Sequence, residues 1–143
     1  MISSRHIAFF LFPIFISGTH AADTFTVATF NVENYFLTQF GTRPVKPEIS
    51  RSKVVEAIVS IQPDVLALQE MGRRAALVDL QKRLKVKGLE FPYREWVIGP
   101  DLAIHLAVLS QFPITVHSHT NVMYLLDRRR FQVGRGFGEV RIQ

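Results

Sequence analysis

Two short segments that are apolar on both faces, separated by an amphipathic helical pattern, constrain the fold of this chain most strongly. Residues 24–32 and 65–69 are rich in β-branched, aromatic or aliphatic side chains, which is typical of strands covered on both sides. Between them, residues 51–62 carry apolar side chains at helical spacing, at Val54, Val55, Ile58 and Ile61. A strand, a helix and a second strand in this order predict a parallel βαβ unit.

The remaining segments extend this pattern into a mixed domain. Ser50 stands directly before the first helical pattern and is predicted as its N-cap. A second amphipathic helix is expected over residues 73–85, with Gly88 ending it. Further strands are expected over residues 93–99, 104–110, 114–120 and 138–143. The fold class that follows is α/β.

Composition limits the chemistry that is available to the chain. Its 143 residues are enough for one domain with a core, and its formal net charge is +5. This basic excess favours an anionic partner, such as a phosphate ester, a nucleic acid or an anionic lipid, without selecting among them. The chain has no cysteine, which excludes disulfides, thiolate nucleophiles and zinc–thiolate centres. Catalysis would therefore depend on oxygen and imidazole groups.

The first 21 residues have the order of features found in a secretory signal peptide. Arg5 precedes an apolar run over residues 7–17, and small residues follow up to Ala21. The run is shorter than the about 20 residues that a membrane-spanning helix needs, and it contains Pro13. We therefore expect a signal peptide over residues 1–21 and a secreted or periplasmic protein without a stable membrane span after cleavage. An N-terminal membrane anchor is the alternative.

Asn31 and Glu70 stand at the carboxyl ends of the first two predicted strands. Functional side chains gather at this edge of parallel sheets, so the two residues could face one crevice. A carboxylate and a neutral carbonyl oxygen are ligands that Mg²⁺ accepts, together with waters and phosphate oxygens. The pattern therefore allows a magnesium site. The alternative is that Asn31 caps a turn and Glu70 is a solvated acid.

Three segments of the chain resemble the endonuclease/exonuclease/phosphatase superfamily. They are TFTVATFNVENYF from residue 24, RSKVVEAIVSIQPDVLALQEMG from residue 51 and HLAVLSQFPI from residue 105. The resemblance covers residues 22–143 as a partial domain and implies the N-terminal part of a four-layer α/β/β/α sandwich of the deoxyribonuclease I type. It implies hydrolysis of phosphodiester or phosphomonoester bonds with Mg²⁺ or Mn²⁺. It also implies that Glu70 is a catalytic metal ligand and that Asn31 helps to position the metal and the phosphate.

The chain departs from the family pattern in its later part. The family's Gly-Asp-x-Asn and Ser-Asp-His motifs do not occur in the 143 residues, and Gln111 stands where relatives often have a basic residue. We therefore expect half of an active site, in a truncated, inactive fragment or in part of a nuclease-like phosphoesterase. A non-catalytic module that binds an anion or a protein partner is the alternative. The substrate stays open among DNA, RNA, lipid headgroups and sugar phosphates.

Several other polar residues have simpler interpretations. His105 lies in an apolar strand and is interpreted as a core imidazole. His117 and His119 alternate on one face of a strand, as a metal-binding pair does, but no third ligand is near in sequence. They are interpreted as exposed strand residues. The arginines at 128–130 are interpreted as a solvated loop rather than a phosphate contact, and Asp101 as a turn residue.

The signal-peptide interpretation predicts that the exported protein begins at Ala22. Cleavage after Ala21 removes Arg5 and no acidic residue, so the net charge falls from +5 to +4 (5 − 1 = 4). N-terminal sequencing of protein recovered from outside the cytoplasm checks this expectation. A product that still begins at Met1 would instead support the membrane anchor.

Overall fold

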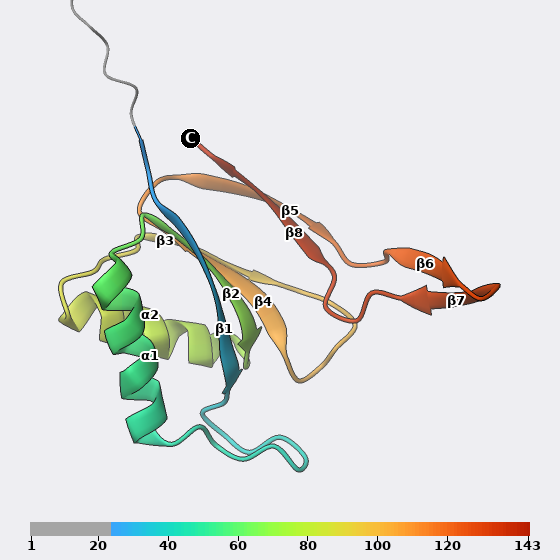
Figure 1. The fold of residues 1–143 in the computed structure, drawn as a ribbon, viewed down its shortest axis with the longest axis horizontal. Coiled ribbons are helices and arrows are strands. Elements are labelled where there is room, and N and C mark those ends of the chain that lie inside the picture. Colours follow the sequence, from blue (N-terminus) through green and yellow to red (C-terminus); the bar gives the residue numbers. More distant parts are fainter. Residues whose placement is uncertain (1–23) are drawn as a thin grey trace, which may run out of the picture.

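The structure is a computed structural model that describes residues 24–143, so the predicted signal peptide lies outside the described residues. The described chain contains two helices and eight strands, which confirms the α/β class (Figure 1). No helix in this part is long and apolar enough to cross a membrane. The elements in chain order are β1 (Val27–Tyr35), α1 (Glu48–Ile61), β2 (Val65–Met71), α2 (Arg74–Val86), β3 (Tyr93–Val97), β4 (His105–Ser110), β5 (Ile114–His119), β6 (Met123–Leu126), β7 (Arg129–Gln132) and β8 (Phe137–Ile142).

The main sheet has the strand order β1-β2-β4-β3. Strands β1 and β2 are parallel, and their register pairs Val27 with Val65 and Asn31 with Gln69. This pairing confirms the predicted parallel strand–helix–strand unit. Strand β4 runs antiparallel to both β2 and β3, so the sheet is mixed and the parallel arrangement is confined to β1 and β2.

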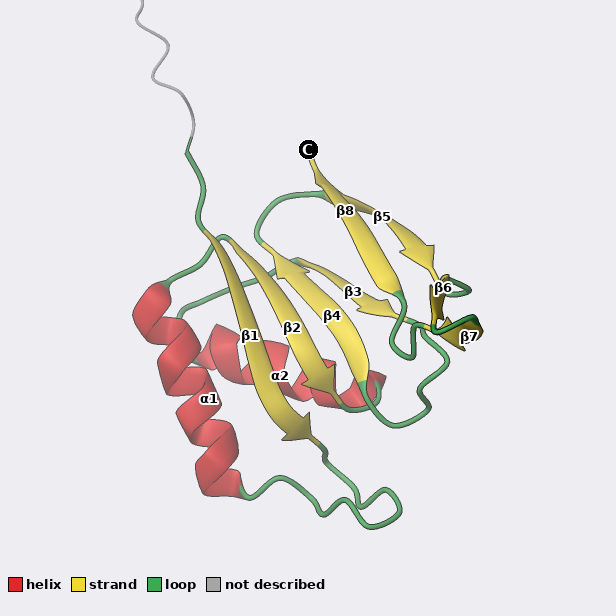
Figure 2. Cartoon of the chain, turned by 45° about the vertical axis from the view of Figure 1, so that its right-hand side comes forward, coloured by secondary structure: helices red, strands yellow, loops and turns green. Residues whose placement is uncertain are grey.

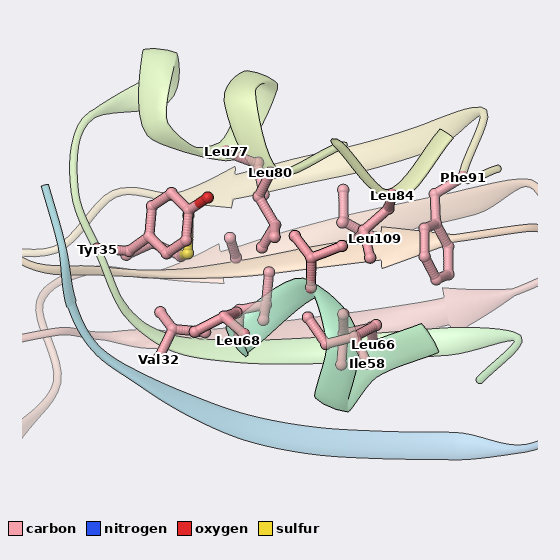
Figure 3. Close-up of a cluster of buried hydrophobic side chains, with 14 of the residues drawn as sticks. Val32, Tyr35, Ile58, Leu66, Leu68, Leu77, Leu80, Leu84, Phe91 and Leu109 are labelled. Carbon is pink, nitrogen blue, oxygen red and sulfur yellow. The ribbon is translucent and has the colours of Figure 1, made fainter. Parts of the chain in front are cut away.

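Both helices cover the same face of the main sheet, and the hydrophobic core lies between them and the sheet (Figure 2). As predicted, α2 buries a stripe of apolar side chains at helical spacing. Figure 3 shows this core, in which side chains of both helices meet those of β1, β2 and β4. Its fully buried members include Val32, Tyr35, Ile58, Leu66, Leu68, Leu77, Leu80, Leu84, Phe91 and Leu109.

Helix α1 differs from the prediction at both ends. It begins at Glu48 rather than after Ser50, with Pro47 in the N-cap position, and the Arg51 N–H donates to the Pro47 carbonyl oxygen at 3.0 Å. Proline at the N-cap removes no intrahelical hydrogen bond, because the N–H groups at a helix start have no partner within the helix, and an acid in the first turn interacts favourably with the helix dipole. Ile61, which was predicted to face inward, is 53% exposed because the helix ends there.

A second layer of strands lies on the face of the main sheet that the helices leave free (Figure 2). Strands β5 and β8 form an antiparallel pair that contacts β3 and β4. The contact is close because Gly138 has no side chain: a Cβ there would lie 2.7 Å from Cγ2 of Val97. Strands β6 and β7 form a separate hairpin, which the sequence interpretation had treated as a loop at residues 128–130.

Gly72 joins the carboxyl ends of β1 and β2. Its N–H donates to the carbonyl oxygen of Tyr35 at 3.2 Å, and its own carbonyl accepts a hydrogen bond from Trp96 Nε1 at 3.0 Å. A Cβ at Gly72 would lie 2.6 Å from the Tyr35 oxygen, which is closer than real contacts allow. The hydroxyl of Tyr35 in turn donates to Asp79 of α2 at 3.0 Å. Any side chain at position 72 would therefore force the backbone of this junction to shift.

We expect Gly72→Ala to lower the free energy of unfolding by about 1–3 kcal/mol, because the added methyl group forces the backbone apart in a packed region. Urea unfolding at fixed pH measures the change. Gly134→Ala is the matched control, since a Cβ at Gly134 meets nothing within 4 Å and its φ is not left-handed. Equal losses in the two variants would contradict the steric argument.

Candidate functional site at the carboxyl ends of β1 and β2

Asn31 and Glu70 lie on neighbouring strands at the same edge of the main sheet. Asn31 pairs with Gln69, so Glu70 follows one position beyond the pair. Strand alternation places Asn31 on the face turned away from the helices, because its neighbour Val32 is buried in the core beneath them. On that same face, Gln69 Nε2 donates to Thr29 Oγ1 at 2.7 Å. The backbone therefore brings the two predicted residues to one edge.

Both strands are irregular at this level. The register passes from the pair Asn31–Gln69 directly to the pair Tyr35–Met71, which leaves more residues on β1 than on β2. Within this interval Glu33, Asn34 and Glu70 have left-handed backbones, with φ of 48°, 53° and 61°. Each costs about 1–2 kcal/mol for a residue with a side chain. Three of the six such residues in the described chain gather here, which supports a functional hypothesis for this edge.

The bulge in β2 decides where Glu70 points. A regular strand would place Glu70 on the helix face after Leu66 and Leu68, but Met71 occupies that face instead. The side chain of Glu70 is 21% exposed, and its Oε1 lies 3.9 Å from a guanidinium nitrogen of Arg135. Arg135 belongs to the connection between β7 and β8, on the side of the second strand layer. The carboxylate thus faces the same side as Asn31.

Asn31 is oriented by its own loop. Its Oδ1 accepts a hydrogen bond from the N–H of Glu33 at 2.9 Å. Asn31 therefore caps a turn, as the alternative interpretation predicted. A carbonyl oxygen has a second lone pair, and the amide nitrogen has two donors. Asn31 can therefore meet a cation through oxygen or a phosphate through nitrogen while it keeps the turn.

Basic side chains hold the left-handed residues of β1 in place. Arg43 donates to Asn34 Oδ1 at 3.0 Å, and Lys46 Nζ donates to the carbonyl oxygen of Glu33 at 3.0 Å. Lys46 is only 9% exposed, so its charge lies in a region that water screens weakly. These contacts offset part of the backbone strain and add positive charge near the candidate site.

Asn31, but not Glu70, lines a depression at this edge. The depression lies beside β1 and the start of α1, and Lys46 and Lys53 are among its other lining residues. Within residues 24–143, no group of three or more His, Asp or Glu side chains is arranged to hold a metal ion. One carboxylate with one amide oxygen still suits Mg²⁺, which keeps several waters and takes substrate phosphate oxygens. The donor chemistry therefore fits a hard cation.

Arg135 is a site residue that the sequence analysis missed. Its backbone packs against Gly99, where a Cβ would lie 2.4 Å from the Arg135 carbonyl carbon. The N–H of Asp101 donates to the carbonyl of Gly134 at 2.7 Å, and Gly136 has a φ of 68°. The glycines on both sides of Arg135 signal a tight turn in the sequence. They do not indicate that the turn lies against Glu70.

Asp101 is a turn residue, as predicted. Its Oδ1 accepts hydrogen bonds from the N–H groups of Ala103 at 2.8 Å and Ile104 at 3.2 Å. Burial acts to raise the pKa of Asp101, but these two bonds and the charges of Arg43 and Arg135 outweigh it, and the pKa lies below its ordinary value. The carboxylate therefore stays ionised and stabilises the loop that positions Arg135.

His105 is the core imidazole that the sequence predicted. It is 5% exposed, its ring centroid lies 3.9 Å from that of Trp96, and its Nδ1 is buried without a hydrogen-bond partner. Burial lowers the pKa of His105 and outweighs the opposing effect of Asp101, which favours the neutral ring in the folded chain.

His117 and His119 lie on one face of β5, with their ring centroids 4.6 Å apart. Strand β8 places Glu139 opposite His117, and Glu139 Oε2 lies 3.5 Å from His119 Nε2. Glu139 is distant from the two histidines in the sequence, so the sequence analysis did not connect it with them. No metal site is formed by these three side chains or by any other such group within residues 24–143. His117, His119 and Glu139 form an exposed polar cluster.

No protein-family model matches the chain, and no curated protein sequence matches it. The geometry defines a broad class: a mixed α/β domain with an acid and an amide at the carboxyl edge of two parallel strands, facing an arginine of a second strand layer. The resemblance to the endonuclease/exonuclease/phosphatase superfamily stays a prediction from the three segments quoted above.

The free energy of unfolding should fall as the pH decreases below about 6.5, in part because of the lowered pKa of His105. Its pKa in the folded chain is below the reference value of 6.5, so the unfolded chain binds the proton first and is favoured. His105→Phe keeps a ring against Trp96 and should flatten the dependence of Tm on pH in this range. His117→Gln, which removes an exposed imidazole, is the control. Equal pH profiles for His105→Phe and the wild type would contradict the argument.

Proposed function

We propose that this chain contributes Glu70 and Asn31 to the active site of a phosphoesterase that depends on Mg²⁺ or Mn²⁺ and has nuclease-like chemistry. The observation that carries the proposal is the bulge at Glu70, which turns an acid out of the core and toward Asn31's face and Arg135. A chain without a use for the acid could place an apolar residue there in a regular strand. The three sequence segments quoted above support the same assignment.

Each residue has a distinct role in this proposal. The carboxylate of Glu70 holds the metal, with Asn31 beside it to orient the metal or a phosphate oxygen. When bound, the metal polarises the phosphoester and lowers the pKa of a coordinated water. Arg135 offers charged donors that suit phosphate oxygens and would leave Glu70, from which it is 3.9 Å away, without breaking a short hydrogen bond.

The proposed fold is the deoxyribonuclease I-like sandwich. In it, α1 and α2 form one outer layer, and the main sheet with the β5–β8 pair forms the two inner layers. The order of helices, main sheet and second strand layer in Figure 2 is compatible with this proposal. The catalytic base and the donors to the leaving group are not assigned to residues of this chain.

A non-catalytic anion-binding module is the second candidate. It is favoured by the basic side chains of Arg43, Lys46 and Arg135 around the strained edge, together with the lack of a three-ligand group among residues 24–143. Such a module would bind phosphate without a metal. Phosphate binding that persists in EDTA and is lost in Arg135→Gln would favour this candidate over the phosphoesterase.

The metal assignment predicts that Glu70→Gln weakens Mn²⁺ and Mg²⁺ binding by at least about tenfold, because it removes the ligand's formal charge and keeps its shape. Titration calorimetry on the full chain measures the affinity, and thermal unfolding verifies that the variant is folded. Asn31→Ala should weaken metal binding less, since a neutral oxygen contributes less to holding a cation.

Glu90→Gln is the matched control for this experiment. Glu90 is a surface acid paired with Lys85, away from the carboxyl ends of β1 and β2. Its substitution should leave the metal affinity unchanged. Wild-type affinity in Glu70→Gln, or an equal loss in Glu90→Gln, would show that Glu70 is not the ligand.

A further inference from the structure

The β6–β7 hairpin presents an apolar strand to solvent. All four residues of β6 are at least 49% exposed, and Leu125 is 71% exposed. Phe131 of β7 is also an exposed large apolar side chain. Figure 1 shows that the hairpin projects beyond both strand layers, so neither layer covers these residues. Clustered apolar surface of this kind marks an interaction site, whereas single exposed apolar residues are ordinary.

The second strand and the turn of the hairpin are basic. Arg128, Arg129 and Arg130 follow Asp127, so these four residues carry a net charge of +2 (3 − 1 = 2). Cross-strand pairing places Leu126 beside Arg129 and Leu125 beside Arg130. None of the ion pairs formed by residues 24–143 involves the three arginines. Apolar and positive side chains therefore lie next to each other in the two cross-strand pairs beside the turn.

This combination fits a lipid surface better than a nucleic acid. The aromatic rings of Tyr124 and Phe131 stack on each other at 5.5 Å and 23°, so each ring has one face occupied and only its outer face is open to a base. Leu125 and Leu126 can neither stack on a base nor form hydrogen bonds, but they partition into hydrocarbon. Arginines beside inserted apolar side chains suit the phosphates of anionic headgroups.

We propose that the β6–β7 hairpin docks on an anionic lipid surface, with the apolar side chains of β6 at the boundary between headgroups and acyl chains and the arginines of β7 and the turn at the headgroups. The proposal goes beyond the phosphoesterase function and does not depend on it. Docking of this kind is sensitive to salt and to the anionic lipid content, because charge attraction and apolar insertion act together.

Co-sedimentation of the full chain with vesicles tests the proposal. Vesicles of phosphatidylcholine and phosphatidylglycerol in equal parts should retain the protein, and vesicles of phosphatidylcholine alone should retain much less. The double variant Leu125→Ser/Leu126→Ser should bind at least about tenfold more weakly. Arg129→Gln/Arg130→Gln should also lose at least about tenfold and show a shallower salt dependence. Leu102→Ser, at an exposed leucine in another loop, is the control and should bind like the wild type.

A spectroscopic measurement locates the contact. The chain has a single tryptophan, Trp96, which lies outside the hairpin and gives a common background in every variant. Leu125→Trp should shift its emission to shorter wavelength on phosphatidylglycerol vesicles, whereas Leu102→Trp should not. Wild-type vesicle binding in both double variants would assign the binding elsewhere, such as to residues 7–17, and would overturn the proposal. Duplex DNA that displaces the vesicles and binds normally to the leucine variant would also overturn it, in favour of a nucleic-acid contact.

Discussion

The close approach of Gly72 to the carbonyl oxygen of Tyr35 is the constraint on which the candidate site depends. It fixes the end of β1 against the end of β2, and Trp96 donates to the Gly72 carbonyl and so ties β3 to the same point. Glu70 lies two residues before Gly72, and the left-handed segment of β1 lies directly before Tyr35. A shift at this junction would therefore move the acid and the loop of Asn31 together.

A hydrogen-bonded chain of polar groups connects this junction to the helix layer. Tyr35 donates to Asp79, and Arg83 donates both to Asp79 at 2.8 Å and to Glu48 of α1 at 2.9 Å. Burial, together with the charge of Asp79, raises the pKa of Tyr35, so the phenol keeps its proton and remains the donor. The bonds to Glu48 and Asp79 raise the pKa of Arg83. Both helices are thus linked to the end of β1 through polar contacts.

The sequence predicts the elements that follow from the spacing of apolar residues. It misses the features that depend on contacts between residues far apart in the chain. The parallel pair β1–β2 and the buried stripe of α2 follow from apolar spacing, which burial enforces. The bulge at Glu70 does not follow from apolar spacing, because the pattern of a strand does not show where an extra residue is inserted. Arg135 reaches Glu70 only through the second strand layer. The β6–β7 hairpin was missed because Asp127 and Arg128 form its two-residue turn with left-handed backbones, where glycine or asparagine would be the expected signal.

The left-handed backbone of Glu70 has a structural cause that can be stated without reference to function. In a regular β2, Glu70 would follow Leu68 into the core beneath α2, and burying an unpaired carboxylate costs more than a left-handed backbone. The bulge is therefore what this fold requires once an acid stands at position 70. In this chain Met71 fills the core position instead. The acid and the bulge occur together, so the strain agrees with the role that we propose for the carboxylate, on the face that it shares with Asn31 and Arg135.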